Sequence, residues 1–309
     1  MKRTRSMISF DWAMKRLLRN KANFEILEGF LSELLRRKIV IKNIAESEGN
    51  KTDADDKSNK VDIFVEADNN ELVIIELQFD SEIDYFHRML YGVSKAITEH
   101  ISEGDPCSEV RKIYSVNIVY FTLGMGDDYI YHGINHFRGL HTNNELMLTP
   151  TQQKAYMKVV AGEIYPEYFI IMVRGFNNVA KSTLDEWVYY LKNNKINDDF
   201  KAQGLDKARK ILNVDNLSDE EKRRYYRSIE DRRIKESEIN TALIEGEAIG
   251  LEKGEAIGLE KGEAIGGEKV LERVVIDSKL NGLSIEQIQS ITKLSKQQIS
   301  EILKRYNLL

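Results

Sequence analysis

Two short segments, Val61-Asp-Ile-Phe-Val-Glu66 and Leu72-Val-Ile-Ile-Glu-Leu-Gln78, decide how this chain is expected to fold. Both are rich in Val and Ile, whose branched side chains favour β-strands. The residues between them, Ala67-Asp-Asn-Asn-Glu71, favour a tight turn, because Asp and Asn side chains bond to nearby backbone groups. Together the three segments predict a β-hairpin.

The sequence on both sides of the hairpin predicts a mixed sheet flanked by helices. The expected helices cover 24–35, 83–100 and 183–193, and the expected strands cover 115–121, 128–135 and 167–174. Because the helix over 83–100 joins the hairpin to the next strand, the sheet should contain at least one crossover connection. We therefore expect an α/β fold with a helical C-terminal extension.

Composition divides the chain into four segments. They are a mixed α/β domain over 1–195, a charged helical extension over 196–245, a Gly-rich octapeptide repeat over 246–269 and a helical tail over 270–309. The repeat places glycine at every fourth position, and each glycine weakens a helix by roughly 1 kcal/mol relative to alanine. The repeat is therefore either a linker or a helix whose glycine stripe lets a second copy approach, which would give a homo-oligomer.

The tail carries two capping boxes, Ser284-Ile-Glu-Gln287 and Ser295-Lys-Gln-Gln298, and each predicts the start of a helix. The arrangement looks like a helix-turn-helix, whose second helix enters a DNA groove. Lys296 and Gln297 on that helix would then contact DNA. Lys293 stands where such turns commonly have glycine, so a small protein-contact hairpin remains the alternative.

Asp62 and Glu76, on the two arms of the predicted hairpin, are the candidate metal ligands. If the turn occupies three residues, Asp62 lies directly opposite Glu76, and Gln78 shares the same face of its strand. Convergent carboxylates can hold a divalent cation such as Mg²⁺, which phosphodiester hydrolysis uses to neutralise charge and to activate water. From spacing alone, both acids could equally lie on the solvent-facing side of the hairpin.

Composition also excludes several classes of protein. Hydrophobic residues make up 42% of the chain and charged residues 31%, which indicates a folded chain rather than a disordered one. No apolar stretch approaches the roughly 20 residues of a membrane helix, and early charges interrupt any signal-peptide pattern. The single cysteine, Cys107, cannot form an internal disulfide. We expect a cytoplasmic protein with no membrane partner.

Several motifs, in their order along the chain, resemble a known family. Asp62 followed by Glu76-Leu-Gln78 resembles the Asp…(Glu/Asp)-x-Lys core of the PD-(D/E)XK nuclease superfamily, with glutamine in place of lysine. Further motifs are Phe10-Asp-Trp-Ala-Met-Lys-Arg-Leu17, Arg88-x-x-Tyr91-x-x-Ser94-Lys95, Leu217-Ser-Asp-Glu-Glu-Lys-Arg-Arg-Tyr225 and the Gly-Glu repeat. Together they resemble the Rpn family of recombination-promoting nucleases and putative transposases, a PD-(D/E)XK nuclease family.

The resemblance implies a PD-(D/E)XK nuclease-like domain and a Mg²⁺-dependent DNA endonuclease associated with recombination or transposition. Asp62 and Glu76 would bind the metal, and Gln78 would take the place of the superfamily's lysine. Because glutamine carries no charge, Lys95 or Arg88 would supply the missing cation.

Two further expectations concern partners. Lys15, in the basic opening segment, would contact DNA phosphates, as would Arg88, since such contacts need only positive charge and reach. The rival functions are a nuclease-like scaffold that binds DNA or protein without cutting, and an interaction protein that assembles through the repeat.

Overall fold

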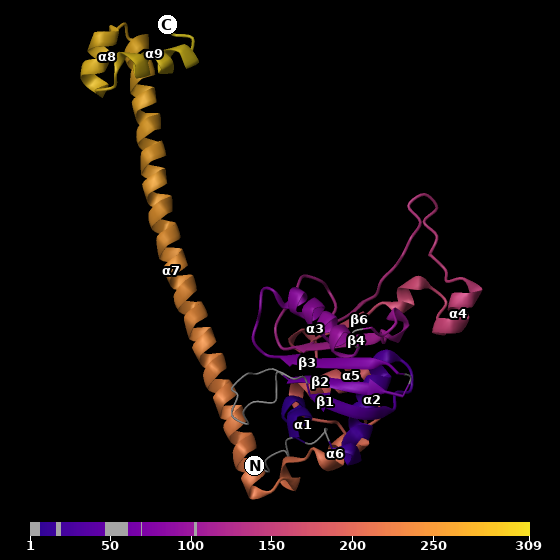
Figure 1. Cartoon of the computed structure of the whole chain (residues 1–309). Helices are drawn as coiled ribbons and strands as arrows, with labels where there is room; N and C mark the ends of the chain where they lie inside the picture. Colours follow the sequence, from indigo (N-terminus) through magenta and orange to yellow (C-terminus); the bar gives the residue numbers. More distant parts are fainter. Residues whose placement is uncertain (1–6, 17–19, 47–60, 69, 102–103) are drawn as a thin grey trace. The chain divides into compact units, whose positions relative to one another are not determined.

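The computed structural model describes residues 7–16, 20–46, 61–68, 70–101 and 104–309 (Figure 1). The chain separates into two compact units, Met1–Tyr225 and Tyr226–Leu309. The first unit contains a sheet and its covering helices, and the second is helical throughout its regular structure.

The first unit is built on a six-stranded mixed sheet within the described residues. In spatial order its strands are β1 (Ile41–Glu46), β2 (Val61–Ala67), β3 (Leu72–Gln78), β4 (Ile113–Val119), β6 (Glu167–Met172) and β5 (Ile130–Gly133). The β1, β2 and β3 strands are antiparallel, β4 is parallel to β3 and to β6, and β5 is antiparallel to β6. The predicted mixed sheet with a crossover is confirmed, whereas β1 was not predicted because its polar composition hides its strand character.

The hairpin between β2 and β3 has the register that a three-residue turn requires. Glu66 pairs with Leu72, and the backbone N–H of Ala67 donates to the carbonyl of Glu71 over 2.9 Å. Asn70 takes a left-handed φ of 60°, which Asn tolerates better than most residues and which suits a tight turn. The predicted hairpin is therefore confirmed.

Helices cover both faces of this sheet (Figure 1). They are α1 (Phe10–Arg16), α2 (Phe24–Leu35), α3 (Tyr85–Glu99), α5 (Thr183–Asn193) and α6 (Leu205–Ile211), whereas α4 (Pro150–Tyr156) lies away from the sheet. Helix α3 packs on the face that carries Phe64, Leu72 and Ile74, through its buried residues Val93 and Ala96. Because side chains alternate along a strand, the residues between them face the opposite layer, where α1, α2 and α6 lie.

The opposite layer is held by an aromatic cluster. The ring of Phe10 lies edge-on to those of Phe30, Trp187 and Tyr190, with centroids 5.6 to 6.1 Å apart. These residues come from α1, α2 and α5, so the cluster fastens three helices to one another. Edge-to-face aromatic pairs contribute about 0.5–1.5 kcal/mol each beyond the area that they bury.

The first unit includes residues after 195, because α6 packs closely on α2. A Cβ atom placed on Gly29 would lie only 2.2 Å from the backbone oxygen of Gln203. The chain just before α6 can approach α2 this closely because glycine has no side chain. Residues at the start of the charged extension therefore belong to the sheet-containing unit.

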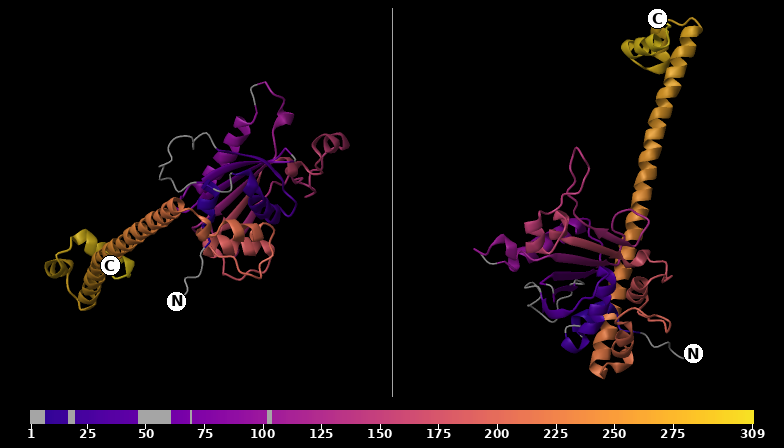
Figure 2. Two further views of the ribbon diagram at one scale, coloured as in Figure 1. Left: turned by 90° about the horizontal axis from the view of Figure 1, so that it is seen from below. Right: turned by 90° about the vertical axis from the view of Figure 1, so that its right-hand side faces the viewer.

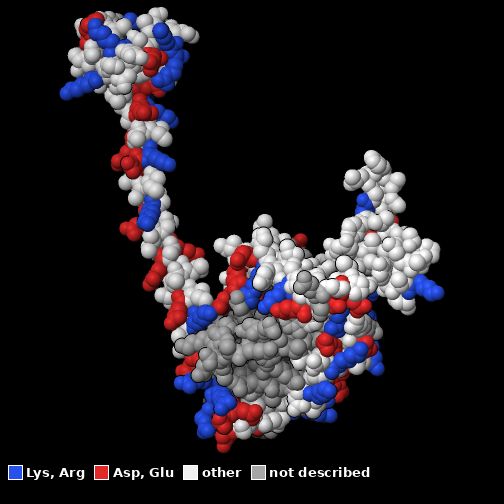
Figure 3. All heavy atoms as spheres, viewed as in Figure 1, with Lys and Arg blue, Asp and Glu red and all other residues white. Residues whose placement is uncertain are grey.

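Residues between β5 and β6 form an arm that projects from the sheet (Figures 1 and 2). The backbone N–H of Leu146 donates to the carbonyl of Phe137, and Arg138 bridges to Glu145, so the arm is a hairpin. Its surface carries few charged side chains (Figure 3). Leu140 at its tip is 98% exposed.

The second unit contains most of the long helix α7 (Asp219–Leu280), followed by α8 (Ile285–Thr292) and α9 (Lys296–Arg305). Residues 246–269 lie inside α7, so the octapeptide repeat is helical. A Cβ on any glycine of the repeat would find open space, with nothing within 4 Å. No helix of the described residues is both long enough and apolar enough to cross a bilayer.

The three terminal helices pack into a small unit around a core of Val275, Ile288, Ile299 and Leu303. Both capping boxes are formed, at Ser284 with Gln287 and at Ser295 with Gln298. Lys293, at the turn between α8 and α9, takes the left-handed φ of 57° that glycine would adopt more readily. Both predicted helices of the tail are thus present, with lysine in the left-handed position between them.

Candidate functional site

The candidate site lies where β2 and β3 run side by side beneath the start of α3. Asp62 is the Cα partner of Glu76 in the antiparallel ladder, so the two positions share one face of the sheet. Gln78 lies two residues beyond Glu76 and therefore falls on this face too. The structure describes the backbone of Asp62 in the ladder and not its side chain.

Glu76 is a largely buried carboxylate held by an arginine. The residue is 8% exposed, and its Oε1 atom lies 2.6 Å from Nη2 of Arg88. A carboxylate in a buried position is costly unless an opposite charge or a metal accompanies it. Arg88 therefore supplies the counter-charge that the position of Glu76 demands.

Gln78 is almost completely buried, at 1% exposure. Its Nε2 group donates to Oε1 of Glu82 over 2.9 Å and to the carbonyl of Asp80 over 3.2 Å. Within the described part of the chain, its Oε1 atom has no hydrogen-bond partner. A buried acceptor without a donor is uncommon in proteins, so it marks a position that a ligand or an ion could satisfy.

Arg88 joins these groups into one network. Its Nη1 group donates to both carboxylate oxygens of Glu82, each over 3.0 Å, while its Nη2 group contacts Glu76. The guanidinium also lies 6.0 Å from the ring centroid of Tyr85. The sequence suggested that Arg88 contacts DNA, and the structure places it against Glu76. Nothing in the sequence indicated that Glu82 belongs to this network.

Lys95, the other proposed cation, is placed differently. It lies further along α3, is about two-fifths exposed and forms an ion pair with Glu99 over 3.3 Å. Of the two proposed cations, only Arg88 has a described contact with Glu76. Lys15 lies in α1, and its side chain is outside the described residues.

Sequence reasoning missed Asn117, which is the neighbour of Glu76 on β4. It is 1% exposed, accepts a hydrogen bond from the hydroxyl of Tyr85 over 3.3 Å, and donates to Oγ of Ser115 over 2.9 Å. Its position extends the polar row from Asp62 through Glu76 to a third strand. The available signal was the alternation of polar residues, Ser115 and Asn117, within an otherwise apolar strand.

The donor set fits a hard divalent cation. Carboxylate and amide oxygens are the ligands that Mg²⁺ prefers, and Glu76 and Gln78 present both types from adjacent positions on one strand face. The unpartnered Oε1 of Gln78 supports this fit. The described side chains form no group of three or more His, Cys, Asp or Glu able to hold a metal.

Other charged side chains near the sheet are paired with one another. Glu71, at the start of β3, forms an ion pair with Arg37. Glu167 accepts from Lys112 and from His132, with distances of 2.9 and 2.8 Å. Burial alone would raise the pKa of Glu167, but the hydrogen bonds from Lys112 and His132 outweigh it and hold that pKa below its usual range. We regard this cluster as structural, since each carboxylate has its own cations.

Both residues of α9 that were predicted to contact DNA interact with neighbouring carboxylates. Lys296 forms a 2.7 Å ion pair with Glu286, and Nε2 of Gln297 lies 3.4 Å from Oε1 of Glu301. The hydrogen bond from Lys296 lowers the pKa of Glu286 to about 2. Any phosphate that binds Lys296 must therefore compete with a neighbouring carboxylate.

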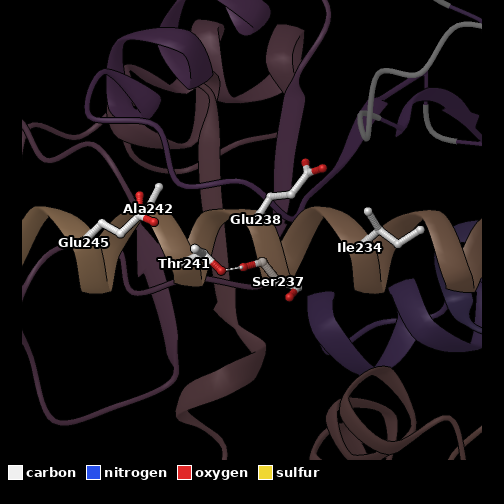
Figure 4. Close-up of a pocket in the computed structure, with 6 residues that line it drawn as sticks. All are labelled: Ile234, Ser237, Glu238, Thr241, Ala242 and Glu245. Atoms are coloured by element: carbon white, nitrogen blue, oxygen red, sulfur yellow. Dashed lines mark hydrogen bonds between the residues drawn. The ribbon is translucent and has the colours of Figure 1, made fainter.

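A shallow depression on α7 is lined by residues of that helix alone (Figure 4). The hydroxyl of Thr241 donates to the backbone oxygen of Ser237 over 2.8 Å, and the side chain of Glu238 points away from this bond. Because a single helix cannot surround a ligand, the depression does not qualify as a binding site.

The antiparallel hairpin, the crossover helix and the parallel strand β4, with Asp62 and Glu76 paired in the ladder of β2 and β3, define an α/β fold of the PD-(D/E)XK nuclease type. Residues 8–242 match the family described as PD-(D/E)XK nuclease family transposase, and the chain belongs to that family. The resemblance noted in the sequence is thus confirmed. No curated protein and no solved structure matches the chain.

Proposed function

We propose that this protein is a metal-dependent DNA endonuclease that acts in recombination or transposition. The observation that carries the proposal is the register of β2 and β3, which sets Asp62 opposite Glu76 and places Gln78 on the same face. Membership of a nuclease and transposase family supports DNA as the substrate.

Asp62 and Glu76 would hold the metal, and the oxygen of Gln78 would complete or orient its surroundings. When bound, Mg²⁺ would neutralise charge on the phosphodiester and lower the pKa of a nearby water. The amide of Gln78 can only orient by hydrogen bonding, since it carries no charge. Positive charge on the substrate side must therefore come from an arginine or lysine, and Arg88 is already beside Glu76.

DNA contacts outside the site would come from basic residues of both units. Lys15 near the N-terminus, and Lys296 and Gln297 on α9, are proposed to touch the phosphates or base edges. These contacts would hold DNA without determining the chemistry at Glu76.

A second candidate function, a scaffold that binds DNA or protein without cutting it, is favoured by one observation. Arg88 already neutralises Glu76, and Gln78 stands where the superfamily has lysine. In that case Asp62 and Glu76 would stabilise the fold and would not bind a metal.

Cleavage of supercoiled plasmid DNA with and without Mg²⁺ separates the two functions. The wild-type chain should nick the plasmid only with the metal, and Asp62→Asn and Glu76→Gln should each lower the rate by roughly 100-fold or more. Glu99→Gln is the matched control, because it removes a carboxylate that pairs with Lys95 on α3. Equal cleavage by all four proteins would show that the nuclease site lies elsewhere.

A further inference from the structure

Arg88 holds two carboxylates at once, and it uses a different nitrogen for each. Nη2 lies 2.6 Å from Glu76, whereas Nη1 lies 3.0 Å from each oxygen of Glu82. The planar guanidinium can make both contacts because its donors are fixed in a fork, an arrangement that a lysine ammonium cannot reproduce.

The two carboxylates differ in how strongly they depend on Arg88. Glu76 is on β3 and nearly buried, so without a metal its charge needs a cation beside it. Glu82 is in the segment before α3, has a side chain 26% exposed, and accepts at its Oε1 atom from the amide of Gln78 as well as from Arg88. Glu82 can therefore hold the guanidinium in place, whereas the contact between Glu76 and Arg88 is the one that a metal could replace.

We propose that Arg88 is a resident counter-ion that changes partner when the metal binds. With a divalent cation on Glu76, Nη2 is released, while Nη1 remains on Glu82 and keeps the guanidinium at the site. The released Nη2 group then donates to a phosphate oxygen of the DNA. This arrangement, which rests on the function proposed above, supplies the positive charge that Gln78 lacks.

The partner exchange has an electrostatic consequence that can be measured without DNA. In the metal-free protein the incoming cation must displace Nη2 from Glu76, so Arg88 weakens the apparent affinity for the metal. Removing Arg88 should therefore tighten metal binding, although it removes a charge that cleavage needs. Removing Glu82 should do the opposite, because the guanidinium would then bind Glu76 alone.

Isothermal titration calorimetry of the full-length chain with MgCl₂ alone tests this proposal. Arg88→Gln should bind Mg²⁺ roughly tenfold more tightly than the wild type, and Glu82→Gln roughly tenfold more weakly. Arg224→Gln and Glu220→Gln are the controls, since they change the same charges in an exposed ion pair on α7. Both controls should bind the metal as the wild type does.

The outcomes separate this inference from the proposed function. If the wild type binds Mg²⁺ and Glu76→Gln does not, but Arg88→Gln shows no tightening, the partner exchange is wrong and the metal site stands. If the wild type binds no metal, the proposed function fails first. Far-ultraviolet circular dichroism checks that each variant is folded. Should Arg88→Gln unfold, Glu82→Gln decides alone, since wild-type affinity in it would overturn the proposal.

A cleavage assay adds the second half of the test. Arg88→Gln should cleave plasmid DNA at least tenfold more slowly than the wild type at saturating Mg²⁺, although it binds the metal more tightly. A purely structural role for Arg88 would not give opposite effects on binding and turnover. Wild-type cleavage by this variant would overturn the phosphate contact.

Discussion

The indole ring of Trp12 packs edge-on against the ring of Tyr225, with 5.5 Å between their centroids. The hydroxyl of Tyr225 also accepts from the backbone N–H of Ser9 over 3.1 Å and donates to the carbonyl of Met7 over 3.3 Å. Two family-like motifs from opposite ends of the matched region therefore meet, which explains why the sheet-containing unit reaches Tyr225.

Tyr225→Phe should lower the free energy of unfolding by about 1–3 kcal/mol, because it removes both hydrogen bonds while keeping the ring. Urea unfolding followed by tryptophan fluorescence measures the change. The control is Tyr91→Phe, in which the affected ring is 69% exposed, and its change should stay within about 0.5 kcal/mol. Equal stability of the two variants would show that Tyr225 does not fasten the N-terminal segment.

Substitution by alanine should change the stability in opposite directions at two glycines. Gly29→Ala places a Cβ against backbone atoms of Gln203 and should destabilise the chain by about 2 kcal/mol or more. Gly92→Ala, in α3, meets nothing within 4 Å and should stabilise it by about 0.5–1 kcal/mol. Thermal unfolding of both variants tests the close approach of α2 to the chain before α6, and a stabilising Gly29→Ala would contradict it.

The lowered pKa of Glu167 should make the stability of the fold depend on pH. Its pKa is lowered in the folded state, so its contribution is fully present above the pKa of the unfolded chain and is lost as the pH falls through the folded value. The free energy of unfolding should therefore decrease between about pH 5 and about pH 3, and Glu167→Gln should flatten part of that decrease. Urea titrations at several pH values measure the slope, and an unchanged slope in the variant would exclude this role.

The repeat in α7 predicts a gain in helix stability on substitution. Replacing Gly250, Gly254 and Gly258 by alanine should raise the melting temperature of α7 measured at 222 nm, since each glycine costs roughly 1 kcal/mol and each new Cβ has open space. A decrease would indicate that the glycines contact another helix.

Assembly through the repeat has its own test, because an eight-residue period does not match the helix. Eight residues turn an α-helix through two turns and about 80° more, so successive repeats face different directions. We expect light scattering to give the same subunit number before and after deletion of residues 246–269. A lower subunit number in the deletion variant would support a homo-oligomer built on this segment.

Lys296 predicts a salt-dependent contribution to DNA binding. Lys296→Ala should weaken binding to DNA of any sequence and reduce the slope of log affinity against log salt by about 1, as expected for one lost phosphate contact. Fluorescence anisotropy at several salt concentrations measures it, with Lys253→Ala in the repeat as control. Equal slopes for the two variants would remove α9 from the DNA-binding surface.

The local pattern of the sequence was sufficient to predict the hairpin, because both arms are rich in Val and Ile and the turn consists of Asp and Asn residues. The register depended on the length of the turn, and the structure shows the three-residue turn that sets Asp62 opposite Glu76. The capping boxes at Ser284 and Ser295 were equally local, since each satisfies backbone groups only three residues away. Such features depend on neighbours in the chain and can be read from it.

The composition of the site depended on contacts between distant segments. Asn117 lies beside Glu76 only because a crossover brings β4 next to β3, and β1 joins the sheet although half of its residues are polar. The sequence places Arg88 and Lys95 on one face of the same helix, so it could not tell which of them contacts Glu76. The position of the start of α3 above β3 decides that Arg88 does. Local secondary-structure propensity carries no information about which distant segments pair with each other. Only the tertiary structure therefore decided which charges surround Glu76.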